Sequence, residues 1–167
     1  DLFDIVIEGR GGHGARPHQA IDPVPAAAEL ILGLQTIVSR NVDPAEPAVI
    51  SIGSVQAGDP GAVSVIPERV RLSGTARTTS PEVRDLIERR IAEAAEGAAK
   101  LAGATAKTTY TRLYPPQIND KALYEAVAPV LKRVAGNRFE SNLLSMGGED
   151  FAFMSECVPG LYFRIGN

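Results

Sequence analysis

The spacing of apolar residues over positions 2–113 constrains the fold more than any other feature of this chain. Four segments have the composition or alternation of half-buried strands: 2–9, 48–56, 65–78 and 105–113. Two segments repeat apolar residues at helical spacing: 23–40 and 81–102. The order β-α-β-β-α-β predicts an α+β fold, a ferredoxin-like sandwich in which both helices cover one face of a four-stranded antiparallel sheet.

Local signals agree with these two helices. Asp22 precedes Pro23 and Ser80 precedes Pro81, so each helix begins with a capping side chain and a proline at its first position. Gly103 follows the second helix and suits the left-handed conformation that commonly ends a helix.

The remaining residues predict a second, smaller part of the chain. The prolines of Tyr114-Pro115-Pro116 interrupt strand pairing and form a stiff connector. An αβαβ pattern follows: a helix over 119–135, a short strand near 139–144, a short helix over 149–156 and a final strand over 161–165. About 50 residues hold too small a core to fold alone. We therefore expect residues 1–114 to be one domain and residues 115–167 to be the remnant of a larger α/β domain.

Both ends of the chain lie beside predicted strands. Asp1 precedes the first strand directly, and Asn167 comes soon after the last one. Neither end has the polar tail that is usual at natural termini, so we expect this chain to be part of a longer protein.

Composition and charge exclude several classes of function. Lys and Arg number 17 against 20 Asp and Glu, a net charge of −3, so we expect no nucleic-acid partner. No apolar stretch approaches the ~20 residues that cross a bilayer, so we expect no membrane partner and a cytoplasmic location, unless a secretory signal precedes Asp1. The single cysteine, Cys157, excludes an internal disulfide, and its apolar neighbours predict a buried packing thiol.

The chain has two histidines, His13 and His18, in one Gly-rich loop. Two ligands are too few for a His-rich metal site, so we expect no metal in this chain. From the residues alone, His13 also fits a plain surface-loop histidine.

Several short segments resemble, in order and spacing, peptidase family M20, and in particular its hippurate hydrolases, N-acyl-amino-acid amidohydrolases and auxin-conjugate hydrolases. They are GGHGARPH over 11–18 followed by IDP over 21–23, VIPE over 65–68, GTAR over 74–77, YPP over 114–116 with Asn119, and MGGEDF over 146–151. Together they span essentially the whole chain.

The resemblance implies a dimeric metal-dependent amidohydrolase that cleaves the amide bond of N-acyl amino acids or peptide-like conjugates. Residues 1–114 would be its lid domain, which pairs with a second copy to form a homodimer. Residues 115–167 would be the returning C-terminal part of the catalytic domain. Two divalent metal ions, expected to be zinc, manganese, cobalt or nickel, would be bound by residues outside this chain.

The resemblance also assigns roles to residues of the lid. His13 would reach into the partner's active site and stabilise the oxyanion that develops during amide hydrolysis. Arg77 would bind the substrate carboxylate, for which a guanidinium offers a bidentate fork, although its strand position equally fits a solvated face. Ser64 would also bind substrate, although it stands where the family usually has a substrate-contacting Asn. Because Ser is shorter and lacks the two amide donors, either a water fills the gap or substrate handling differs there.

In the second part, Gly147 and Gly148 are the expected substrate-binding residues. Glu149 and Asp150 would support the site from behind it or simply begin a helix, where the helix dipole favours acidic residues. His18 is expected to have a structural role in its own loop.

Two functions follow from this reading. The first is the dimerisation and substrate-binding part of an M20 amidohydrolase, inactive in isolation. The alternative is a non-enzymatic ferredoxin-like module that binds small molecules or regulates through dimerisation, because this sandwich hosts many functions.

Overall fold

The structure, a computed structural model, describes residues 1–141 and 144–166 of the 167-residue chain. It divides into two compact units, Asp1–Leu113 and Tyr114–Asn167. We describe each unit by itself. The assignment of the units to a lid and to part of a catalytic domain stays a prediction.

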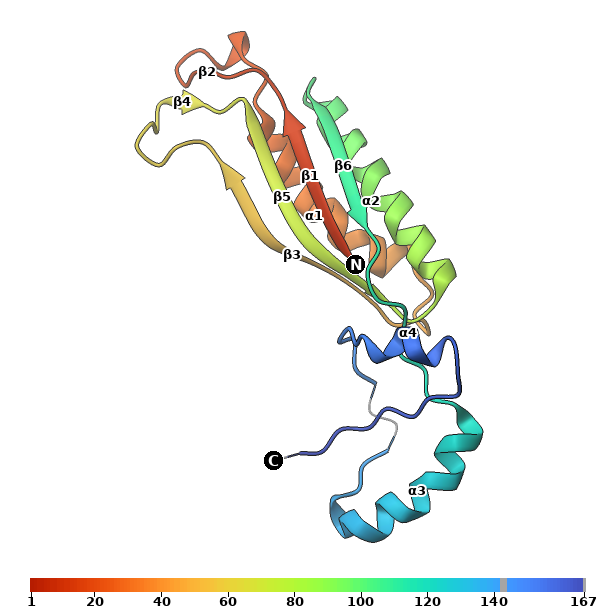
Figure 1. Cartoon of the computed structure of the whole chain (residues 1–167). Helices are drawn as coiled ribbons and strands as arrows, with labels where there is room; N and C mark the ends of the chain where they lie inside the picture. Colours follow the sequence, from red (N-terminus) through yellow and green to blue (C-terminus); the bar gives the residue numbers. More distant parts are fainter. Residues whose placement is uncertain (142–143, 167) are drawn as a thin grey trace. The chain divides into compact units, whose positions relative to one another are not determined.

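The first unit has the predicted sandwich. Its sheet has the strand order β3-β5-β1-β6, and all three pairings are antiparallel. The strands are β1 (Leu2–Glu8), β3 (Ala48–Ala57), β5 (Arg69–Thr78) and β6 (Thr105–Thr111). The helices α1 (Pro23–Asn41) and α2 (Pro81–Leu101) lie side by side on one face of the sheet (Figure 1). The predicted fold class is therefore confirmed.

One hydrophobic core fills the space between the sheet and these helices. Strand alternation turns every second residue of β1 and β5 inward, and each helix turns one face toward the sheet. The largest fully buried side chains of this core are Phe3, Ile5, Ile7, Leu30, Leu34, Ile37, Val70, Leu72, Ile87 and Ile91. The opposite face of β5 carries the arginines, as its alternation predicts.

The predicted helix signals are present as contacts. The Asp22 carboxylate accepts a hydrogen bond from Val24 N–H at 2.9 Å, and the Ser80 hydroxyl accepts one from Val83 N–H at 3.3 Å. Gly103 has φ +73°, the left-handed conformation expected after α2.

The predicted strand over 65–78 is two strands. β4 (Val65–Ile66) is separate from β5, and Pro67, which has no N–H to donate, lies between them. β4 leaves the main sheet and pairs antiparallel with β2 (Gly12–His13), as Figure 1 shows. The sequence analysis did not predict this small second ladder.

Gly74 is the tightest point of the main sheet. A Cβ there would lie 2.3 Å from Cζ of Phe3 and 2.3 Å from the carbonyl oxygen of Ser51. Phe3 faces Gly74 across the β1–β5 pairing, so its ring occupies the space that any side chain would need. The glycine therefore lets the largest core side chain pack directly on the strand.

We expect Gly74→Ala to lower the free energy of unfolding by about 1–3 kcal/mol, because the added methyl overpacks the core. Urea unfolding of the chain measures this change. Gly97→Ala is the matched control, since a Cβ at Gly97 meets nothing within 4 Å and alanine is the better helix former. Equal stability of Gly74→Ala and the parent chain would contradict the packing argument.

The second unit contains the predicted long helix. α3 (Lys121–Ala135) begins at Asp120, whose carboxylate accepts from Leu123 N–H at 2.8 Å. It ends at Gly136, which has φ +58° and opens the short 3-10 helix η2 (Gly136–Arg138). No residue of α3 is fully buried within the structure as described. Leu123, Val127 and Leu131 are half-buried, whereas Val130 and Val134 are exposed.

Three other predictions for the second unit need correction. The final strand over 161–165 does not form, because the described residues of this unit offer no strand to pair with it. The predicted helix over 149–156 is the shorter α4 (Phe151–Ser155). In the predicted strand near 139–144, residues 142–143 lie outside the described residues, and the described neighbours are not extended into a ladder.

The prediction that Cys157 is buried is wrong. The thiol is exposed. The helix before it buries only Ala152, and its neighbours Phe153 and Met154 are also exposed, so apolar sequence neighbours did not imply a local core.

Candidate functional site

The Gly-rich loop between β1 and α1 is fastened to the main chain of other segments. Gly9 N–H donates to Glu68 C=O at 2.8 Å, and Arg10 N–H donates to Ile21 C=O at 2.8 Å. Further along, Gly14 N–H donates to Ser64 C=O at 2.7 Å. These bonds fix the backbone conformation of the loop, so a side chain on it has a defined position.

Two glycines are needed for this close approach. A Cβ on Gly9 would lie 2.1 Å from the carbonyl oxygen of Ile21, and one on Gly14 would lie 3.1 Å from that of Ser64. The glycines therefore serve backbone contact between segments.

His13 is exposed on β2, and one of its ring nitrogens is occupied. Ala15 N–H donates to His13 Nδ1 at 3.1 Å, and Arg16 N–H donates to the His13 carbonyl at 2.8 Å. A nitrogen that accepts from an amide carries no hydrogen, so the neutral ring has its hydrogen on Nε2. The loop thus presents His13 as an N–H donor toward its surroundings.

The backbone of Ser64 lies beside the backbone of the His13 segment, which the sequence did not predict. Its carbonyl accepts the Gly14 bond, and Val65, the next residue, is the direct partner of His13 in the β2–β4 ladder. The structure therefore brings together two of the predicted site residues from segments about 50 positions apart in sequence.

Arg77 lies in the four-stranded sheet, at the end of that sheet far from the loop that carries His13. It pairs with Val49 near the end of β5, whereas Arg69, at the start of β5, adjoins the loop that carries His13. Arg77 is eight residue steps along β5 from Arg69, a distance of about 27 Å at 3.4 Å per residue. One chain cannot bring His13 and Arg77 onto one small substrate.

His18 lies in the 3-10 helix η1 (Pro17–Gln19), and its side chain is exposed. Backbone bonds fix this turn: Ala20 N–H donates to Pro17 C=O at 3.1 Å, and Gln19 N–H donates to Arg16 C=O at 3.0 Å. A structural role for the His18 imidazole stays a prediction.

The predicted loop of the second unit contains one defined polar contact. Tyr162 O–H donates to the Glu149 carboxylate at 2.7 Å, and this bond holds the pKa of Glu149 below its ordinary value. Asp150 precedes α4 without capping it through its side chain. Gly147 N–H donates to Ser145 Oγ at 3.4 Å, and no contact tests the substrate-binding role predicted for Gly147 and Gly148.

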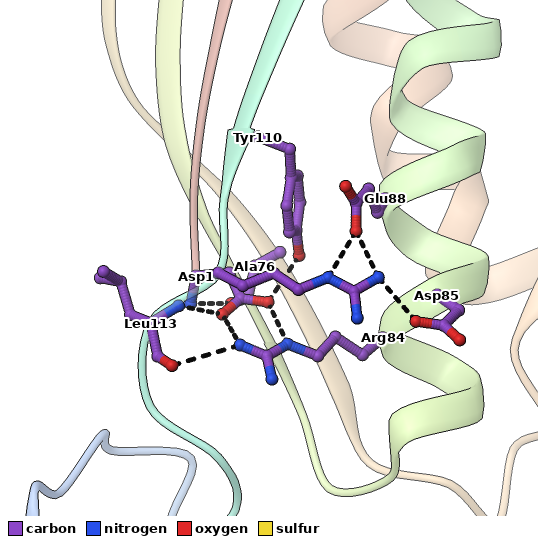
Figure 2. A network of polar contacts seen from close by, with 8 residues as sticks. Asp1, Ala76, Arg84, Asp85, Glu88, Tyr110 and Leu113 are labelled. Atoms are coloured by element: carbon purple, nitrogen blue, oxygen red, sulfur yellow. Dashed lines mark hydrogen bonds and ion pairs between the residues drawn. The ribbon is translucent and has the colours of Figure 1, made fainter.

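A partly buried polar network that the sequence analysis missed joins the two ends of the first unit (Figure 2). The Asp1 carboxylate accepts from Arg84 Nε at 2.7 Å and Nη2 at 2.5 Å, from Tyr110 O–H at 3.0 Å and from Leu113 N–H at 2.9 Å. Burial, followed by the charge of Glu88, raises the pKa of Tyr110 and keeps its hydroxyl protonated as a donor.

A second arginine, Arg112, makes a separate set of ion pairs with α2. It donates to Glu88 at 2.7 Å and to Asp85 at 2.6 Å, and these bonds raise its pKa. Arg84 belongs to α2, and Arg112, which follows β6, contacts two acidic residues of α2. The first residue of the unit and the segment after its last strand are therefore tied to the same helix.

Within residues 1–141 and 144–166, no group of three or more His, Cys, Asp or Glu side chains is arranged to hold a metal ion. We therefore derive no chemical step through a metal from these residues. In the same described part of the chain, no helix combines the length and hydropathy needed to span a bilayer.

The fold and the fastened histidine loop define a ferredoxin-like domain that presents a hydrogen-bond donor at one end of its sheet. Residues 2–102 match the peptidase dimerisation domain of M20 peptidases. The chain belongs to this family.

Two curated relatives are similar over nearly the whole chain. N-acetylcysteine deacetylase of Bacillus subtilis is 38% identical over 166 residues, which are 99% of this chain and 43% of the relative. N-acetyldiaminopimelate deacetylase of Enterococcus faecalis is 40% identical over 164 residues, 98% of this chain and 43% of the relative. The chain thus spans about two fifths of these proteins.

Solved structures agree with the fold. A dinuclear metal binding peptidase of family M20 from Bacillus subtilis has a TM-score of 0.71 and 34% identity, covering 95% of this chain and 38% of its own. A putative aminohydrolase from methicillin resistant Staphylococcus aureus has a TM-score of 0.77 and 32% identity, covering 95% of this chain and 40% of its own. These matches support the sequence resemblance to M20.

Proposed function

We propose that this chain supplies the dimerisation and substrate-binding part of a metal-dependent amidohydrolase that cleaves N-acyl amino acids or peptide-like conjugates. The observation that carries the proposal is the His13 ring, held by Ala15 N–H in the tautomer that donates from Nε2. Family membership and the deacetylase names of the relatives support the reaction class.

The chemistry needs such a donor. Water adds to the amide carbonyl carbon, the carbonyl oxygen becomes negative, and the carbon–nitrogen bond then breaks to give a carboxylic acid and a free amine. A fixed N–H donor lowers the barrier because it interacts most strongly with the oxygen when that oxygen is charged. We assign this role to His13. The pair of divalent metal ions, when bound outside this chain, would supply the activated water.

In the same reaction, Arg77 would bind the carboxylate of the substrate. Arg77 lies about 27 Å along β5 from the His13 end of its own sheet. Two-fold pairing of edge strands runs antiparallel, so it places the Arg77 end of one sheet beside the His13 end of the other. We infer that each active site takes Arg77 from one subunit and His13 from its partner.

The edge strand β3 is the better candidate for this pairing. Its sequence, AVISIGSVQA, has no charged residue, and Val55 on it is exposed. Beside it lies an apolar groove of about 230 Å³ whose lining includes Leu34 and Val38 of α1. A long uncharged edge next to apolar surface is the kind that proteins cover with another chain. The opposite edge, β6, carries Lys107.

We expect Leu32→Glu on α1 to weaken the dimer roughly 100-fold or more, because each dimer would bury two charged side chains in place of two leucines. Leu32 is exposed and precedes Gln35 of the groove by one turn, so the subunit itself should fold normally. Sedimentation over a concentration series measures the dissociation constant. Leu101→Glu, on an exposed residue of α2, is the control and should remain dimeric. Equal dimer strength of the two variants would exclude this face.

The reaction itself is tested on two proteins. We expect the whole protein to release amino acids from N-acyl substrates and to contain about two metal ions per subunit, and the chain of residues 1–167 alone to do neither. Metal analysis and an amine-release assay decide this. Hydrolysis by the isolated chain would refute the division of labour. An inactive, metal-free whole protein that still dimerises would favour the regulatory module.

A further inference from the structure

Val65 is the neighbour of His13 on the surface of the β2–β4 ladder. The two residues are direct partners in an antiparallel pair, and residues directly opposite one another in such a pair place their side chains on the same face. The bond from Gly14 N–H to Ser64 C=O flanks the pair and marks it as the non-hydrogen-bonded kind. In this kind the side chains approach most closely.

Val65 is an apolar residue, yet no other side chain of its own unit buries it. Ile66, which points to the other face of the ladder, is 9% exposed and contributes to the interior, whereas Val65 is 57% exposed. The adjoining turn adds Val63, which is almost entirely exposed. Bonds from Gly61 N–H to Asp59 Oδ1 at 2.8 Å and from Val65 N–H to Ala62 C=O at 3.0 Å hold this turn in place.

The ladder therefore presents two kinds of group side by side. One is the imidazole N–H donor of His13, and the other is the branched apolar side chain of Val65, with the exposed Val63 two residues before it on the adjoining turn. A ligand that suits this surface has a carbonyl oxygen with an apolar substituent on the same carbonyl carbon.

We propose that Val65 determines acyl-group specificity by contacting the acyl chain of the substrate whose carbonyl oxygen His13 binds. This inference rests on the proposed function. The carbonyl carbon carries the acyl chain on one side and the amide nitrogen on the other. The nitrogen side leads to a carboxylate, which gains nothing from an isopropyl group, so the uncharged acyl side is the one that matches Val65. Along the substrate, Val65 would thus contact the acyl chain and His13 the carbonyl oxygen. Arg77 of the other subunit would contact the carboxylate.

The test uses the whole protein with Val65→Thr, which keeps the shape of the side chain and replaces one methyl by a hydroxyl. N-acetyl and N-butanoyl forms of the L-amino acid that the wild-type protein releases fastest are compared. We expect the ratio of kcat/KM for butanoyl over acetyl to fall about fourfold or more, the worth of roughly one buried methylene. Retained turnover of the acetyl substrate shows that the variant is folded.

Val24→Thr is the matched control, the same chemical change on an exposed valine of α1 that does not pair with His13, and it should leave the ratio unchanged. A second series varies the amino acid at constant acyl group. An unchanged acyl ratio in Val65→Thr, or a change in amino-acid preference instead, overturns the acyl assignment. Failure of the wild-type protein to hydrolyse any N-acyl amino acid overturns the proposed function, so the two failures are distinct.

Discussion

His13→Ala in the whole protein is expected to lower kcat about 10²–10³-fold, the usual loss when one oxyanion donor is removed. The metal content should stay unchanged, because His13 is exposed on the β2–β4 ladder and belongs to no metal-binding group among the described residues. Steady-state kinetics and metal analysis of the same preparation measure both quantities. Near-wild-type turnover would refute the role of His13.

Two further variants sharpen this result. His13→Gln keeps an N–H donor on a side chain of similar reach, so its loss should be smaller than that of His13→Ala. His18→Ala removes the other histidine of the same loop, five residues away and exposed, and should change kcat far less. Equal losses for His18→Ala and His13→Ala would mean that the loop, and not the donor, is what matters.

His13→Ala combined with a second variant, Arg77→Ala, tests whether the active site is shared between subunits. His13→Ala and Arg77→Ala homodimers should both be impaired. After mixing and subunit exchange, each heterodimer has one site with His13 and Arg77 both intact, so activity should rise to about a quarter of wild type. No recovery, with heterodimers shown by mass, would place both residues in a site made by one chain.

Much of the sandwich could be predicted because its signals are local. The Asp22-Pro23 and Ser80-Pro81 pairs fix two helix starts, and alternation along β1 and β5 separates buried from exposed faces. The β2–β4 ladder could not be found in this way, because a strand of only two residues has no measurable alternation. It depends on a Gly14–Ser64 bond that is non-local in sequence.

For the candidate site, the sequence predicts the residues but not how they are arranged in space. The motifs identified His13, Ser64 and Arg77, but no sequence period indicates that the first two are neighbours and that the third lies at the far end of β5. The Asp1 network was also missed, since it joins residues 83 and 109 positions apart. In the second unit, apolar runs were interpreted as paired strands although the described residues provide no partner strand.

The Asp1 network is expected to contribute to the stability of the first unit. The side chain of Asp1 is 5% exposed and that of Arg84 is 17% exposed, so both charges are largely removed from water. Their bidentate contact compensates this desolvation, and Tyr110 O–H and Leu113 N–H satisfy the remaining carboxylate lone pairs. The network also joins the first residue of the unit to the end of its last strand.

Arg84→Met keeps the length and packing of the side chain but leaves the Asp1 carboxylate buried without its cation. We expect the free energy of unfolding to fall by about 3–5 kcal/mol, the usual effect of breaking a buried pair on one side. Asp1→Asn combined with Arg84→Met should lose less than Arg84→Met alone, because the uncompensated charge is then gone. Arg112→Met is the matched control: its side chain is 46% exposed, so its ion pairs should contribute about 0–1 kcal/mol. Urea unfolding of the four chains measures these differences, and equal losses for Arg84→Met and Arg112→Met would show that burial of Asp1 does not set the stability of this junction.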